Sequence, residues 1–84
     1  MTEDQRAERV RELVGAMSPL GGREVSSSDR VVDDLGYDSV ALLELALALE
    51  VEFDLQAIGE DQAVDLLTVG DIEHLVDQLA RKPG

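Results

Sequence analysis

The first part of the chain shows apolar residues at helical spacing. They recur every three or four positions, with charged residues between them: Ala7, Val10, Leu13, Val14 and Met17. Thr2, followed three residues later by Gln5, matches a capping box, in which each side chain bonds the backbone N–H of the other residue. The pattern therefore predicts a helix over about residues 3–16, stopped by Ser18-Pro19 and Gly21-Gly22.

A second predicted helix is apolar on two faces. Glu44 is the only polar residue from 40 to 49. At 100° per residue, one stripe contains Leu42, Leu45, Ala46, Leu49 and Phe53, and the nearly opposite stripe contains Val40, Leu43, Leu47 and Val51. A small chain can hardly bury a helix on all sides, so we assign the first stripe to the core. The second is expected to be an exposed contact strip beside Glu44 and Glu50, unless loops or a short helix cover it.

The remaining segments complete an all-helical plan. Residues 18–38 form a long connection that Val25, Val31, Val32 and Leu35 are expected to pin to the core. Residues 60–66 are predicted to form a short helix, and Thr68 to cap a last helix with a single apolar face. The expected fold is one all-α domain over residues 1–84, a small four-helix bundle with three main helices, one short helix and a long first loop.

Composition and charge narrow the possible functions. The 84 residues carry a formal net charge of −12 and no cysteine, which leaves out disulfides and thiol chemistry. Tyr37 and Phe53 are the only aromatics, so the core is expected to be aliphatic. The acidic balance argues against nucleic acid and anionic membranes as partners. With no signal-peptide pattern and no spanning segment, we expect a soluble, cytoplasmic monomer.

The acidic residues are concentrated in one part of the chain. Residues 31–80 carry 13 acidic side chains and no lysine or arginine. This segment is either a solvated face that maintains solubility or a docking surface for basic partners.

The sequence contains no recognisable set of catalytic acid, base and nucleophile. His74 is the only histidine and is expected to be exposed. The sequence also contains no metal-binding loop and no glycine-rich phosphate loop. We therefore assign no catalytic residue and no metal site. Ser39 stands out, because it lies at the predicted start of the second helix, where backbone N–H groups and the helix dipole would favour a phosphate ester. Alternatively, Ser39 or Asp38 serves only as the helix N-cap.

Three segments resemble acyl carrier proteins. Residues 34–40 read D-L-G-Y-D-S-V, residues 49–53 read L-E-V-E-F, and residues 68–72 read T-V-G-D-I. They resemble the 4′-phosphopantetheine attachment region of that family and the start of its last helix, and the resemblance covers residues 31–79. The resemblance implies that a separate magnesium-dependent phosphopantetheinyl transferase attaches phosphopantetheine from coenzyme A to Ser39. It also implies that Asp38 aids recognition by the transferase and that the chain itself is not catalytic.

The resemblance also implies a surface for partner enzymes, such as a ketosynthase and an acyltransferase. The matching positions are Val40, Leu43, Glu44, Leu47 and Glu50. Tyr37 replaces a small residue that is common in fatty-acid carriers, and G-Y-D-S is frequent among type II polyketide carriers. We therefore expect a discrete acyl carrier protein of a polyketide pathway. The alternatives are an amino-acyl or aryl carrier of non-ribosomal peptide synthesis, and an acidic helical adaptor that is never modified.

Overall fold

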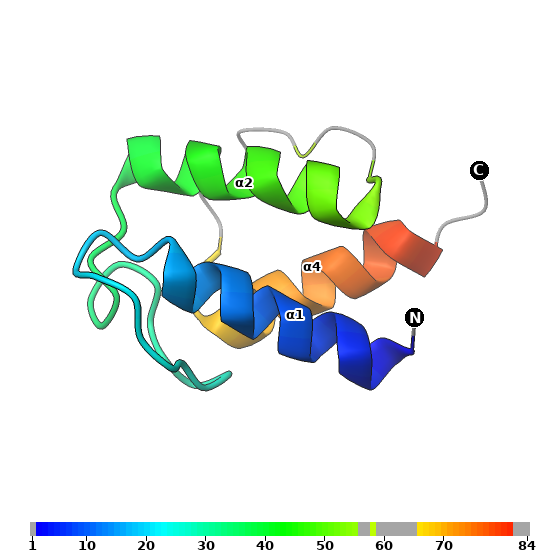
Figure 1. Ribbon diagram of the computed structural model, residues 1–84, viewed down its shortest axis with the longest axis horizontal. Helices are drawn as coiled ribbons and strands as arrows, with labels where there is room; N and C mark the ends of the chain where they lie inside the picture. The colour runs from blue at the N-terminus through cyan, green and yellow to red at the C-terminus, as the bar shows by residue number, and fades with distance from the viewer. Residues whose placement is uncertain (1, 56–57, 59–65, 82–84) are drawn as a thin grey trace.

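The residues that the structure describes contain three helices, which are arranged in two layers. The computed structural model describes residues 2–55, 58 and 66–81. The helices are α1 (Glu3–Ala16), α2 (Ser39–Phe53) and α4 (Val69–Arg81); α1 and α4 cross each other, and α2 lies over them (Figure 1). The end of α1 and the start of α2 lie at one end of the molecule, and the start of α1 and the end of α4 lie toward the other (Figure 1). The predicted short helix at 60–66 falls outside the described residues, except for Leu66, which is not helical.

Helix α1 begins and ends as its sequence predicts. Gln5 N–H donates to Thr2 Oγ1 at 3.1 Å and Thr2 N–H donates to Gln5 Oε1 at 2.9 Å, which confirms the capping box. At its other end, the long connection returns onto Gly15. A Cβ atom there would clash with the backbone oxygen of Arg23, so only glycine allows this close approach. The fixed end of α1 becomes an anchor for the segment that precedes α2.

The two apolar stripes of α2 separate as predicted. Leu42, Leu45, Ala46 and Leu49 are buried in the core, with Phe53 half-buried beside them. The opposite stripe is exposed: Val40 by 63%, Leu43 by 39%, Leu47 by 62% and Val51 by 85%. This confirms the assignment of the first stripe to the core and the exposure of the second.

Two expectations about the core are wrong. Tyr37 is as deeply buried as the leucines, so the core is not purely aliphatic. Its ring brings a hydroxyl group into the interior, and that hydroxyl donates to the Val14 carbonyl at 2.7 Å. In the long connection, Val31 and Leu35 are fully buried, but Val32 is exposed and does not pin the loop. Val32 is adjacent to a buried valine, and neighbouring side chains in an irregular segment point in different directions.

Among the residues that the structure describes, three ion pairs join the first helix to the acidic segment, which the sequence alone did not predict. They link arginines of α1 to carboxylates of α2 and α4: Arg6–Asp77 at 2.8 Å, Arg9–Glu52 at 3.1 Å and Arg11–Glu73 at 3.3 Å. The basic residues of the first helix therefore offset part of the acidic charge of residues 31–80.

None of the described helices has both the length and the apolar character of a membrane-spanning segment.

Candidate functional site

Asp38 caps the start of α2. Its backbone is extended, with φ −115° and ψ −176°, and its carboxylate accepts a hydrogen bond from the Ala41 N–H at 2.8 Å. This is the usual geometry of an N-cap aspartate. Ser39 is therefore the first residue of the helix, and its hydroxyl is not used for capping.

The Ser39 side chain is exposed to solvent. Within the described part of the chain, no group forms a hydrogen bond with its Oγ atom. The first turn of α2 contains no acidic residue, and the first N–H groups of a helix lack intrahelical acceptors. These groups and the helix dipole favour an anion at this position. The residues present thus fit a phosphate ester on Ser39, with room for a group that extends into solvent.

A tight turn places Asp38 and Ser39. The N–H groups of Leu35, Gly36 and Tyr37 donate to the carbonyls of Arg30, Val32 and Val31, each at 3.1 Å. Gly36 has φ +76°, in the left-handed region, and a Cβ atom on it would lie 2.7 Å from Leu20 Cγ. A side chain at Gly36 would therefore be strained and would also displace Leu20.

The exposed stripe of α2 begins beside Ser39. Val40, Leu43 and Leu47 lie on one face of the helix, and Glu44 is exposed among them. At about 1.5 Å per residue, the strip from Ser39 to Leu47 is about 12 Å long. An apolar strip of this kind, with a carboxylate on it, is typical of a contact surface.

Glu50 is tied to its own chain. Its side chain is half-buried, and Oε2 accepts a hydrogen bond from the Ile58 N–H at 3.0 Å. The carboxylate thus binds the backbone at Ile58, which the sequence did not predict because the partner is a backbone group in a loop. Of the five residues assigned to a partner surface, Glu50 is the one with this internal contact.

The start of α4 uses its polar residues for capping. Asp71 N–H donates to Thr68 Oγ1 at 3.2 Å, and Asp71 Oδ2 accepts from the N–H groups of Thr68 and Leu67, each at 3.0 Å. The hydrogen bonds that the carboxylate accepts stabilise its charged form and so lower the pKa of Asp71.

His74 is exposed on the same helix, as predicted. Among the described residues, no group of three histidine, cysteine or acidic side chains could hold a metal ion.

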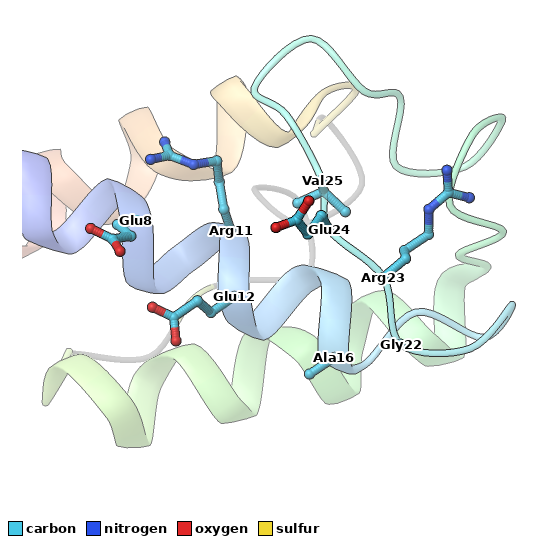
Figure 2. A pocket seen from close by; sticks show the side chains of 8 residues that line it. All are labelled: Glu8, Arg11, Glu12, Ala16, Gly22, Arg23, Glu24 and Val25. Carbon is cyan, nitrogen blue, oxygen red and sulfur yellow. The ribbon is translucent and has the colours of Figure 1, made fainter.

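A surface hollow of about 630 Å³ lies elsewhere, between α1 and residues 22–25 (Figure 2). Its lining includes carboxylates and guanidinium groups, among them Glu8, Glu12 and Arg11. Arg11 is already paired with Glu73. Neither Ser39 nor the exposed stripe of α2 contributes to this hollow, so it is separate from the candidate site.

Comparison with known proteins gives a consistent result. The family model described as "Phosphopantetheine attachment site" matches residues 8–76, a range that contains all of α2. The chain is also 37% identical over 70 residues to an acyl carrier protein of Sulfurovum sp. (strain NBC37-1), and the match covers 83% of this chain and 92% of that relative. The chain therefore belongs to the acyl carrier protein family, non-catalytic carriers to which a phosphopantetheinyl transferase covalently attaches 4′-phosphopantetheine.

Proposed function

We propose that Ser39 carries the 4′-phosphopantetheine arm and that the protein presents polyketide intermediates to its partner enzymes. The observation that supports this is the exposed Ser39 hydroxyl, which has no hydrogen-bond partner within the described chain, at the start of a helix that favours anions. Ser39 Oγ would attack the phosphorus of coenzyme A that carries the pantetheine, the P–O bond of the diphosphate would break, and 3′,5′-adenosine diphosphate would leave. The hydroxyl proton would pass to a base of the transferase. The terminal thiol of the attached arm holds acyl groups as thioesters.

The proposed docking surface consists of Val40, Leu43, Glu44, Leu47 and Glu50. The three apolar members are exposed next to Ser39 and can lose water against a partner. Glu44 adds negative charge that would steer a basic surface of the transferase, ketosynthase or acyltransferase. Such a surface suits a weak, short-lived contact, as a carrier that visits several enzymes requires. Glu50 would contribute charge at the edge while it holds Ile58.

Polyketide synthesis is supported by the residues around Ser39. Tyr37 gives the G-Y-D-S sequence, and Ala41 and Val51 make α2 less acidic than in fatty-acid carriers. The alternative is an amino-acyl or aryl carrier of non-ribosomal peptide synthesis. Loading with malonyl and with amino-acyl donors would distinguish the two. We further propose that residues 1–84 form one acyl carrier domain that acts as a cytoplasmic monomer.

The attachment site can be tested by intact mass measurement after incubation with coenzyme A and a broad-specificity transferase. The parent and the control Ser28→Ala, which alters another exposed serine, should each gain the mass of one arm. Ser39→Ala should gain none while its circular dichroism spectrum stays helical. A mass gain on Ser39→Ala that maps to residues 26–28 would show that the proposed site is wrong.

A further inference from the structure

The carbonyl groups at the end of α1 receive hydrogen bonds from outside the helix. An α-helix leaves its last four carbonyls without intrahelical donors. Here the Gly15 carbonyl accepts from the Arg23 N–H at 3.3 Å, and the Val14 carbonyl accepts from the Tyr37 hydroxyl at 2.7 Å. Tyr37 thus acts as a side-chain cap for a helix that ended 21 residues earlier in the sequence.

A second side-chain bond joins the same two segments. Ser18, just after α1, is buried, and its hydroxyl donates to the Leu35 carbonyl at 2.7 Å. Together with the Tyr37 bond, it fixes the turn at residues 35–37 to the end of α1 at two points. Burial raises the pKa of Tyr37 to about 12, so its hydroxyl remains a protonated donor at neutral pH.

The turn that these bonds hold leads directly into α2. Asp38, the N-cap, follows Tyr37, and Ser39 comes next. Two residues of extended chain span at most about 7 Å, so little chain is available to absorb a displacement of the Tyr37 backbone before Ser39. The exposed stripe, by contrast, lies on α2 itself and is held by the packing of Leu42, Leu45 and Leu49.

We propose that Tyr37 is a positioning residue for the modification of Ser39: its hydroxyl bond to Val14 fixes the start of α2 on α1, so that Ser39 Oγ is presented to the transferase in one orientation. This inference rests on the proposed role of Ser39. Loss of the bond would loosen the turn but leave the docking stripe in place. The rate of the transfer step should therefore fall, whereas binding of the carrier to the transferase should be retained.

The test compares Tyr37→Phe with Asp77→Asn in the full chain. Tyr37→Phe removes only the hydroxyl group. Asp77→Asn removes the ion pair that joins Arg6 on α1 to Asp77 on α4, so it perturbs stability without touching the turn at residues 35–37. For each apo protein, kcat and KM for the carrier are measured with coenzyme A and transferase, and the midpoint of chemical unfolding is measured in parallel.

For Tyr37→Phe we expect kcat to fall by about tenfold with KM unchanged, since small errors in placing a reacting atom can cost up to about a hundredfold. Amide hydrogen exchange at Ser39 and Val40 should become faster in this variant. Asp77→Asn should keep the parental kcat and the parental exchange at these two amides. Ser18→Ala, which removes the second bond, should change kcat in the same direction and serves as the test if Tyr37→Phe does not fold.

Three results would overturn the proposal. Tyr37→Phe could retain the parental kcat, its effect could be confined to KM, or kcat could follow stability equally in Tyr37→Phe and Asp77→Asn. The proposed function fails in a different way, because the parent protein would then take up no arm, or Ser39→Ala would still be modified.

Discussion

The two stripes of α2 predict different costs for the same truncation at Leu49 and at Leu43. Leu49 is 1% exposed and Leu43 is 39% exposed. A leucine-to-alanine change removes three carbon groups, which are worth about 0.8 kcal/mol each when buried, or about 2.4 kcal/mol together. The cavity left in the core should bring Leu49→Ala to about 3–4 kcal/mol. At Leu43 about three-fifths of the transfer energy applies and solvent can fill the space, so we expect about 1–1.5 kcal/mol.

Urea unfolding followed by circular dichroism measures both free energies of unfolding. The same two variants separate stability from docking, because Leu43 lies on the proposed partner surface and Leu49 does not. Under conditions in which both are folded, Leu43→Ala should be modified more slowly by the transferase, and Leu49→Ala should be modified at nearly the parental rate. Equal losses of stability in the two variants would refute the assignment of the stripes. Equal rates of modification would refute the role of Leu43 in docking.

Two further predictions concern charged groups. Glu44→Lys should slow modification by the transferase at low salt, and the difference from the parent should shrink as salt screens the charge. The control Glu8→Lys, the same change on α1, should have little effect. Equal rates for Glu44→Lys and the parent at low salt would rule out steering by this carboxylate. The lowered pKa of Asp71 means that its stabilisation of the fold is complete above the ordinary carboxyl pKa and is lost as the pH falls through the lowered value. Asp71→Ala should therefore lower the free energy of unfolding at neutral pH and reduce the acid dependence of unfolding. Parallel stability curves for the two proteins against pH would contradict this.

Features that depend on local sequence could be predicted. The capping box of Thr2 and Gln5 is set by residues within one helical turn, and the structure contains both of its hydrogen bonds. The two stripes of α2 follow from the helical period, together with the limited volume that a small chain can bury. Which stripe is exposed could be decided because Glu44 interrupts only one of them.

Features that depend on distant partners could not be predicted. The sequence indicates Tyr37 only as a feature of the family motif, but its hydroxyl binds a carbonyl 23 positions earlier in the chain. Arg6 and Asp77 are 71 positions apart, and no local pattern connects them. The helical period and the family resemblance place Glu50 at the edge of the exposed stripe, but a loop N–H binds it. In each case the polar group is satisfied by tertiary structure, which hydrophobic periodicity does not report.

The ion pairs also affect which carboxylates remain available to a partner. The arginines of α1 engage Glu52, Glu73 and Asp77, which belong to α2 and α4. Within the described residues, neither Asp38 nor Glu44 has an arginine or lysine partner, and both are exposed. Negative charge is thus partly neutralised where the helices pack on one another and left unneutralised beside Ser39. An approaching basic surface would meet the uncompensated field at the start of α2, which supports docking at that end of the helix.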